Sequence, residues 1–436
     1  MLKRLSFANL LHKLCETLEQ LPEHRLGANM QYSLKDAGLA AFSVFYTQSP
    51  SFLAHQRAMQ QAKGQSNAQS LFGMREIPCD NQIRALLDPI HPNNLISVYA
   101  EVEQGLEEAG ELAKFRSFHD TILMAMDGTW YFSSKKIHCD NCNHKENADG
   151  TTTYFHSAIT PVIVKAGDSH VIPLAPEFIW PQDGHEKQDC ELEAAKRWIN
   201  AHGDHLTAWK VTILGDDLLC KQPFCSLLLD HKLNFILVCK PDSHPELYRW
   251  IDYLETQGEL GQLSLRCWNG RFTEIYHYRY ANQVPLRGGE DALMVNCCEL
   301  TITREDTNEI LYRNSFATHF TVTEMTVKDI VRDGRARWKV ENENNNVLKT
   351  KGYHLEHNFG HGNQFLSAVL VSLNLLAFLF HTTFDLVDTK YQQLRSALAT
   401  RKTFFDDIRA LTRYLLFESW DHLLDFMFTQ LELVPP

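Results

Sequence analysis

The amino-acid sequence predicts an α/β protein with a helical region at each end. Apolar residues recur at helical spacing in residues 1–118 and again in 365–436. Between them, residues 119–252 alternate strand-like and helix-like segments, which is the pattern of an α/β layer. A second strand-rich stretch, 253–320, follows, and residues 321–364 contain a charged helix. We therefore expect an α/β domain that is interrupted by a β-rich insertion at 253–320 and completed by the helix in 321–364.

The composition is that of a globular protein with well-developed cores. The chain has 436 residues, 44% of them hydrophobic, which is enough for two or three domains. Its 11 cysteines lack the dense, regular spacing of a disulfide scaffold and fit a reducing cytoplasm. The formal net charge of -12 argues against indiscriminate nucleic-acid binding, although local basic patches decide contacts with phosphate. DNA therefore remains a possible partner.

The N-terminal region, 1–118, is predicted to be a compact helical domain. Its first 21 residues are amphipathic and contain no uninterrupted apolar run, so they predict a helix and not a signal peptide. Ser33 and Asp36 form the pattern of a capping box, and Pro89 ends a later helix. Such a domain could recognise a DNA sequence or form a dimer contact. It could equally be packed scaffold, because no clear helix-turn-helix spacing is present.

The central region begins with three strand-like segments that predict an antiparallel meander: TILMAMDGTWYFSS, TTTYFHSAITPVIV and SHVIPLAPEFIW. A helix, a strand, a second helix and a second strand follow. Asp127 falls on the first strand, and Asp216 falls at the end of the fourth. The insertion contains alternating tyrosines, Tyr276, Tyr278 and Tyr280, which are more often core residues, and Trp268, on which a flipped base could stack.

The stretch from 327 to 351 is predicted to be one helix. Thr326 and Asp329 fit a capping box, and Gly352 fits a helix stop. Arg337 and Glu341 are one turn apart on the same face. The simplest interpretation of that pair is a solvated i,i+4 ion pair, which would stabilise the helix by only ~0.3–0.5 kcal/mol. The alternative is that cations have gathered around one functional carboxylate.

Three carboxylates in this order suggest metal-dependent phosphodiester chemistry. Asp127, Asp216 and Glu341 would come from two strands and a facing helix. Three such acids can hold two Mg²⁺ ions roughly 3.5–4 Å apart, one activating a water or 3′-hydroxyl and the other stabilising the leaving oxygen. Asp217 is the rival of Asp216, which we prefer because it comes first after the strand.

Four strings carry a resemblance to a known family: DGTWYFSSKKIHCDNC, LGDD, RARWKVENENNNVLK and GYHLEHNFGHG. Over most of its length the chain resembles the DDE transposases of bacterial insertion sequences, the cut-and-paste class. The resemblance implies a ribonuclease-H-like catalytic domain with a β insertion, in which the first and fourth strands are neighbours. It implies that Asp127, Asp216 and Glu341 form the catalytic triad and bind two Mg²⁺ or Mn²⁺ ions. It also implies cleavage of element ends and transfer to target DNA by a homodimer in the bacterial cytoplasm, at the nucleoid.

Many members of that family carry a tyrosine, arginine, glutamate and lysine signature around the last acid, and here it is incomplete. Arg337 and Glu341 fit, but Gly334 occupies the tyrosine position and Leu348 the lysine position. Lys349 comes one residue late and would point about 100° away on an ideal helix. The basic residues expected to contact DNA are Arg337, Lys349, Lys339 and Lys351.

A second constellation, HCDNCNH, is half of a zinc signature, with candidate ligands His138, Cys139, Cys142 and His144. Cys190 or His156 could complete a structural zinc site. The alternative is a pair of reduced cysteines in an ordinary turn. Three further histidines follow the glycine helix stop, and we expect them in a loop near phosphates: His354, His357 and His361.

The segment Phe365 to Phe384 is almost continuously apolar and long enough to cross a bilayer. Ser367, Ser372 and Asn374 interrupt it, and amphipathic helices follow that could cover it. We therefore predict a buried helix, no membrane association and solubility without detergent. Two other functional hypotheses stay open, namely a zinc-dependent hydrolase and a catalytically inactive, DNA-binding descendant of a transposase.

Overall fold

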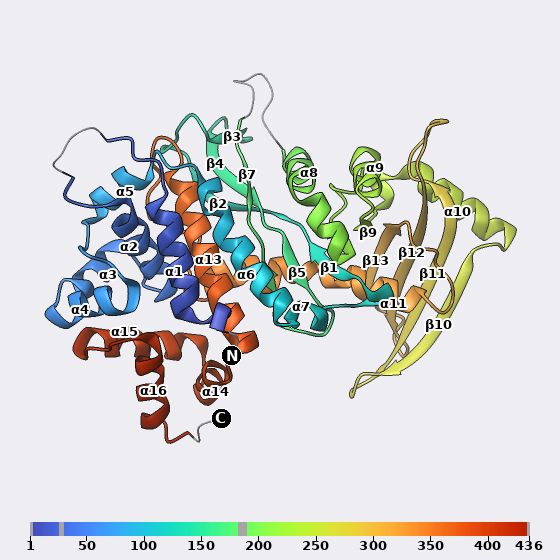
Figure 1. Ribbon diagram of the computed structural model, residues 1–436. Coiled ribbons are helices and arrows are strands. Elements are labelled where there is room, and N and C mark those ends of the chain that lie inside the picture. The colour runs from blue at the N-terminus through green and yellow to red at the C-terminus, as the bar shows by residue number, and fades with distance from the viewer. Residues whose placement is uncertain (1–2, 26–29, 182–189, 434–436) are drawn as a thin grey trace.

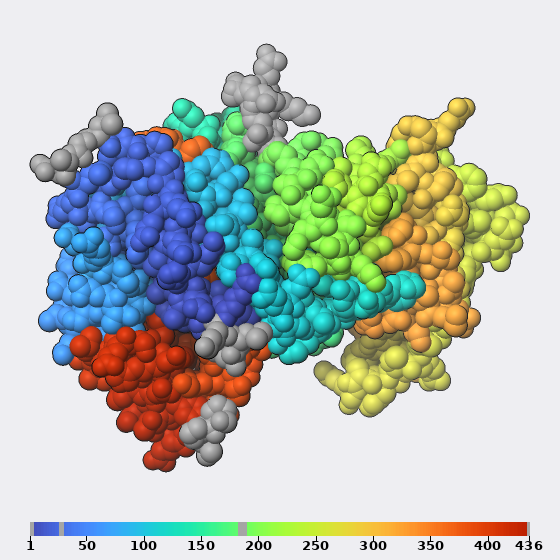
Figure 2. All heavy atoms as spheres, viewed as in Figure 1, coloured from blue at the N-terminus to red at the C-terminus, as the bar shows by residue number. Residues whose placement is uncertain are grey.

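The computed structural model describes residues 3–25, 30–181 and 190–433. It is a mixed α/β structure with a large mixed sheet and helical N- and C-terminal regions, as expected. In Figure 1 the helices from both ends of the chain form a lobe on one side, and the large sheet extends away from them. Figure 2 shows the N-terminal residues (blue) and the C-terminal residues (red) closely packed at that end, opposite the β-rich insertion (yellow).

The helical lobe combines residues that the sequence had suggested as two separate regions. Its N-terminal helices are α1 Phe7–Glu19, α2 Leu34–Tyr46, α3 Phe52–Met59, α4 Ala62–Phe72, α5 Asp80–Leu87, α6 Ile96–Glu108 and α7 Glu111–Lys114. Its C-terminal helices are α13 Leu366–Val387, α14 Thr389–Ala397, α15 Arg401–Tyr414 and α16 Trp420–Gln430. Helix α13 packs against α2, α6 and α14 and is buried continuously from Leu366 to Phe384, so the predicted buried helix is confirmed. Within the described residues it is the one helix long and apolar enough to span a membrane, and its apolar window lies entirely inside the protein.

Asp88 fixes the start of α13 on the N-terminal helices. The first backbone N–H groups of a helix have no partner inside the helix and need an external acceptor. The Asp88 carboxylate accepts hydrogen bonds from the N–H groups of Asn363 (3.0 Å), Gln364 (3.0 Å) and Leu366 (3.2 Å). Gly362 has a φ of +71°, and a Cβ there would lie 2.2 Å from Asp88 Oδ1. The loop before α13, which contains His361, is therefore held in place.

The large sheet has the strand order β10-β11-β12-β13-β9-β8-β1-β5-β6. Its strands are β1 Ile122–Ala125, β5 Val162–Val164, β6 Ile172–Pro173, β8 Val211–Gly215, β9 Asn234–Val238, β10 Gly261–Trp268, β11 Thr273–Pro285, β12 Met294–Arg304 and β13 Ile310–Thr318. Strands β1, β8 and β9 are parallel neighbours, and the remaining pairs are antiparallel. Three helices connect strands of this sheet: α8 Glu191–Trp209, α9 Gln222–Asp230 and α10 Pro245–Gln257.

The predicted three-stranded meander is present but bent, so that each strand contributes to two sheets. Strands β2 Gly128–Ser134, β4 Thr152–Ile159 and β7 Glu177–Ile179 continue β1, β5 and β6 into a smaller sheet, to which β3 Asn143–Glu146 adds a fourth strand. Pro161 and Pro176 lie in two of the breaks, and proline cannot donate a ladder hydrogen bond. Asp127 lies at the third break, so it occupies a bend between β1 and β2 instead of the middle of a strand.

The β-rich insertion extends the large sheet. Strand β13 pairs with β9 through Phe316, Ala317 and Thr318, so β10 to β13 continue the same hydrogen-bonded surface. Tyr278 is buried, and Tyr276 and Tyr280 are partly buried, so the expectation that the alternating tyrosines are core residues is confirmed for Tyr278. Trp268 at the end of β10 is 67% exposed.

The predicted helix over 327–351 is present, but its winding changes along its length. It consists of α11 Val327–Arg335, a 3₁₀ turn Ala336–Trp338, a π-helical segment Val340–Asn345 and α12 Asn346–Thr350. The expected capping box at Thr326 does not form, because the side chain of Thr326 makes no cap hydrogen bond and Asp329 pairs with Arg332 (2.7 Å). The box at Ser33 does form, with the Asp36 N–H donating to Ser33 Oγ (2.9 Å).

Candidate functional site

Asp127, Asp216 and Glu341 line one open cavity of about 870 Å³. Asp127 is the second residue after the end of β1, and Asp216 is the first residue after the end of β8. These strands are parallel neighbours, so their carboxyl ends lie at the same edge of the sheet. The π-helical segment brings Glu341 to that edge from a third element. The three acids thus line the same cavity, although the first and the last are 214 residues apart along the chain (341 − 127).

The Asp127 carboxyl is electrostatically coupled to the other two acids. Burial, together with the charges of Asp216 and Glu341, raises the pKa of Asp127 to about 6. The Arg337 guanidinium and a hydrogen bond from the Gly128 N–H oppose this rise. Within the described residues Arg337 forms no ion pair with Glu341, so the simple interpretation of the two as an i,i+4 pair is wrong. The charge of Arg337 acts on Asp127 instead.

Four cationic side chains line the same cavity: Lys240, Arg313, Arg337 and Lys349. They come from the end of β9, from β13 and from the long helix, so the insertion strand β13 contributes directly to the site. A cavity that combines acids with surrounding Lys and Arg can receive a phosphate-bearing chain together with metal ions, since the cations neutralise phosphate and the carboxylates bind the metal.

The π-helical segment explains how Lys349 reaches the cavity. A π turn closes its hydrogen bond from i to i+5 and so contains one residue more than an α turn. The expected rotation of Lys349 away from Glu341 assumed an ideal α-helix, and that assumption is wrong here. Lys349 lines the cavity and pairs with Glu356 (2.9 Å), while Leu348 is fully buried.

The two other basic residues expected at DNA lie elsewhere. Lys339 donates a hydrogen bond to the backbone carbonyl of Asp168, and Lys351 is exposed beyond the end of α12. Neither is among the residues that line the cavity. Arg337 and Lys349 are therefore the members of the predicted basic set that accompany the acids.

The structure distinguishes Asp216 from its neighbour Asp217. Both line the cavity, but the Asp217 carboxylate accepts hydrogen bonds from the Lys240 N–H (2.7 Å) and from the Ser243 hydroxyl. Asp216 accepts from the N–H groups of the turn that follows it, and its charge acts on Asp127. Asp217 thus holds the loops after β8 and β9 together, and Asp216 faces the other acids.

Glu191 is a fourth carboxylate near this group, which sequence reasoning missed. It is the first residue of α8, and its pKa is raised to about 7 by burial and by the charges of Asp127 and Asp216. A Cβ at Gly128 would lie 2.2 Å from Glu191 Cδ, so only glycine leaves room for this carboxylate beside Asp127. No motif in the sequence connects residues 128 and 191, and the contact exists only because α8 begins at this edge of the sheet.

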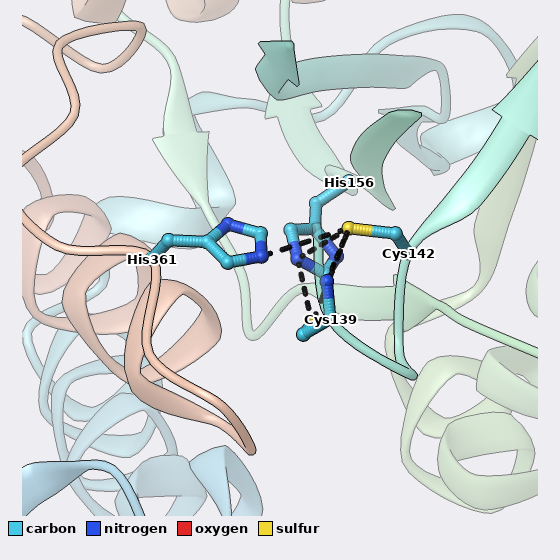
Figure 3. A group of neighbouring side chains, drawn as sticks. All are labelled: Cys139, Cys142, His156 and His361. Carbon is cyan, nitrogen blue, oxygen red and sulfur yellow. Dashed lines mark hydrogen bonds between the residues drawn. The ribbon is translucent and has the colours of Figure 1, made fainter. Parts of the chain in front are cut away.

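A separate group of four side chains could hold a metal ion: Cys139, Cys142, His156 and His361. Figure 3 shows their sulfur and nitrogen atoms converging from the turn before β3, from β4 and from the loop before α13. Cys142 Sγ lies 4.0 Å from Cys139 Sγ, 3.5 Å from His156 Nε2 and 3.7 Å from His361 Nε2. A tetrahedral zinc, with Zn–S of about 2.3 Å and Zn–N of about 2.0 Å, places its ligand atoms roughly 3.3–3.8 Å apart. The two sulfur–nitrogen distances match that spacing, and the sulfur–sulfur distance of 4.0 Å is slightly longer.

The sequence identified half of this group correctly. Cys139 and Cys142 belong to it, and of the two suggested completions His156 is present and the exposed Cys190 is not. The predicted ligands His138 and His144 lie outside the group: His138 stacks on Tyr154, with ring centroids 4.3 Å apart, and His144 is on an exposed position of β3. His361, expected near phosphates, is the fourth member.

The side chains of this group already favour a thiolate. The Cys142 thiol, and then the His156 and His361 rings, stabilise the charged form of Cys139 and hold the pKa of its thiol below the ordinary value. The thiolate is the form that binds metal ions. Within the described residues, this and one further Cys and His group are the sets whose ligand atoms all lie within 4.8 Å of one another; the three acids are spaced more widely.

In comparisons of the chain with known proteins, no protein-family model and no curated protein matches it.

Proposed function

We propose that the protein is a transposase that binds the ends of an insertion sequence and catalyses metal-dependent DNA cleavage and strand transfer. One observation carries the proposal: Asp127, Asp216 and Glu341, chosen from the sequence for this chemistry, line a single cavity together with four cations. Carboxylates bind the hard divalent cations used in phosphodiester cleavage, and the surrounding Lys and Arg side chains suit a DNA backbone.

The sheet supports a ribonuclease-H-like assignment of the catalytic domain. Its core order is β6-β5-β1-β8-β9, with an antiparallel first half and parallel β1, β8 and β9. In chain order these are the third, second, first, fourth and fifth strands of the core, so the first and fourth are neighbours, as that fold requires. The insertion then enters between β9 and the helix that carries Glu341.

The residues present fit two Mg²⁺ or Mn²⁺ ions. Burial, and to a lesser extent the charges of Asp216 and Glu341, raise the pKa of Asp127 to about 6, and a divalent cation bound between the carboxylates would offset their mutual repulsion. Bound between the carboxylates, the ions would activate the attacking water or 3′-hydroxyl and stabilise the leaving oxygen. Arg337 and Lys349 would orient the DNA phosphates around the acids, and Asp217 would keep the loop of Asp216 in position.

The two other hypotheses receive less support. Four protein side chains make up the Cys139, Cys142, His156 and His361 group, which leaves no open position for a substrate or water, whereas a catalytic zinc keeps one. We therefore propose that this group holds a structural zinc ion. An inactive descendant would be expected to have lost one of the acids, and all three line the cavity.

Cleavage of DNA tests the proposed function directly. Purified protein is incubated with candidate element-end DNA in Mg²⁺ or Mn²⁺, and 3′-end cleavage and joining to target DNA are scored. We expect both to require the metal and the element end. Hydrolysis without DNA specificity, supported by zinc alone, would favour the zinc hydrolase, and end binding without cleavage under every metal would favour the inactive descendant.

A further inference from the structure

Three other side chains of types that can bind a metal ion lie close together near the loop that contains Asp216. Cys220 lies in the loop after β8, Cys239 directly follows β9, and His244 immediately precedes α10. The ligand atoms of the three lie within 4.8 Å of one another, and all three residues are buried, with exposed fractions of 0%, 0% and 4%. Two thiols and one imidazole are a donor set that selects zinc over Mg²⁺ or Ca²⁺.

The His244 ring is oriented as a ligand. Its Nδ1 lies 3.4 Å from the backbone carbonyl of Leu286, and because a carbonyl can only accept, Nδ1 carries the hydrogen. The lone pair is then on Nε2, which is buried and has no hydrogen-bond partner among the described residues. A metal-binding histidine usually donates a hydrogen bond from one ring nitrogen to a carbonyl or carboxylate, and its other nitrogen binds the metal through its lone pair.

An additional donor lies beside this ring. Asp217 Oδ1 is 3.6 Å from His244 Nε2, too far for a good hydrogen bond but suitable for two ligands of one ion. Cys298 on β12 provides a contrast, because it is also buried but belongs to neither group of candidate ligands. The Cys220 thiol, in contrast, contacts those of Cys225 and Cys239. Hydrophobic packing explains one buried thiol but not an unpartnered imidazole nitrogen beside two of them.

We infer that Cys220, Cys239 and His244 bind one Zn²⁺ ion, with Asp217 as a further donor beside His244. Such an ion would join the ends of the adjacent parallel strands β8 and β9 to the start of α10. It would thereby fix the loop of residues 216–220, whose first residue lines the acidic cavity. This inference goes beyond the proposed function, and its test needs no DNA.

Zinc content per chain tests the inference. The full-length, tag-free protein is purified from zinc-supplemented medium, desalted and measured by elemental analysis. We expect two zinc ions per chain in the wild type and one in Cys239→Ser. Cys142→Ser, which removes a ligand of the other group, should also hold one, and the double variant none. Cys298→Ser is the matched control, a buried cysteine outside both groups, and should keep two.

A second measurement does not depend on Cys239→Ser folding. In Cys142→Ser loaded with Co²⁺, the remaining site should still show the thiolate-to-cobalt charge-transfer absorption, at about half of the wild-type intensity per chain. Absence of that band would overturn the inference. So would a folded Cys239→Ser variant that retains as much zinc as the wild type while Cys142→Ser loses one ion.

Discussion

The acidic cavity and the Cys139 group both suit a cation, but they differ in every property that decides how the cation is held. The cavity is open, is lined by carboxylates and contains competing Lys and Arg side chains. The Cys139 group is largely buried and consists of two thiols and two imidazoles at ligand spacing. Hard, exchangeable ions bind to oxygen and tightly held ions bind to sulfur and nitrogen. The difference fits the proposal that the cavity holds exchangeable ions for catalysis and that the Cys139 group holds a structural ion.

Removing a carboxylate from the cavity should have the largest effect and should leave the structure intact. We expect Asp127→Asn, Asp216→Asn and Glu341→Gln each to lower single-turnover cleavage at least roughly 100-fold, because each loses charge that holds the metal. Zinc content should not change. Asp127→Asn should melt no lower than the wild type, since burial and neighbouring acids disfavour its charge.

Asp217→Asn is the matched variant for the second acid. If Asp216→Asn stayed active and Asp217→Asn did not, the roles assigned to these neighbours would be reversed.

The opposite pattern is expected for the Cys139 group. Cys142→Ser and His361→Ala should each lose one zinc ion per chain and lower the free energy of unfolding by about 3 kcal/mol or more, because a metal site contributes its binding energy to folding. The measurements are elemental analysis and denaturant unfolding. His138→Ala and His144→Ala are controls that should keep the zinc. Loss of zinc from either control, with His361→Ala unaffected, would restore the ligand set suggested by sequence alone.

Arg337 tests whether the cations of the cavity contact DNA. Arg337→Ala should weaken end-DNA binding and reduce the slope of log affinity against log salt by about one, because one phosphate contact is lost. Cleavage should fall far more than the melting temperature. Lys349→Ala should act in the same direction but less strongly. Lys339→Ala is the control, since Lys339 bonds to the Asp168 carbonyl and not to the cavity. An unchanged salt slope in Arg337→Ala would show that the cavity does not receive the DNA backbone.

The smallest effect expected is a pH dependence of metal binding in the cavity. The folded-state pKa of Asp127 is about 6, above its ordinary value of 3.8, so the carboxyl is protonated below about pH 6 and Mn²⁺ affinity should fall as the pH drops through that value. Without metal, stability from this residue is greatest below pH 3.8 and declines as the pH rises to about 6. In Asp216→Asn the midpoint should move to lower pH, and in Arg337→Ala to higher pH. Mn²⁺ titrations from pH 5 to 8 measure the midpoint in each variant and in the wild type. If all three midpoints coincided, Asp127 would not be coupled to either neighbour.

Sequence reasoning located the acids because their signals are local, and it failed where the deciding contact is distant. Strand ends at Asp127 and Asp216 can be recognised from apolar runs that stop. His361 cannot be assigned to the cysteines by spacing, because it lies 219 residues from Cys142 (361 − 142) and is brought there by the Asp88 contacts at the start of α13. Periodicity likewise predicted the meander, but the bend that divides it between two sheets depends on proline positions and on tertiary packing.

The π-helical segment Val340–Asn345, which contains Glu341, also affects how such a site should be sought in other chains. On an unbroken α-helix a residue seven positions after Glu341 would share its face, whereas here Lys349, eight positions later, lines the same cavity as that acid. A search that fixes the separation at seven residues will reject such a chain even though both side chains line one cavity. A search pattern should therefore allow one extra residue between the acid and the base, because a π turn can accommodate it.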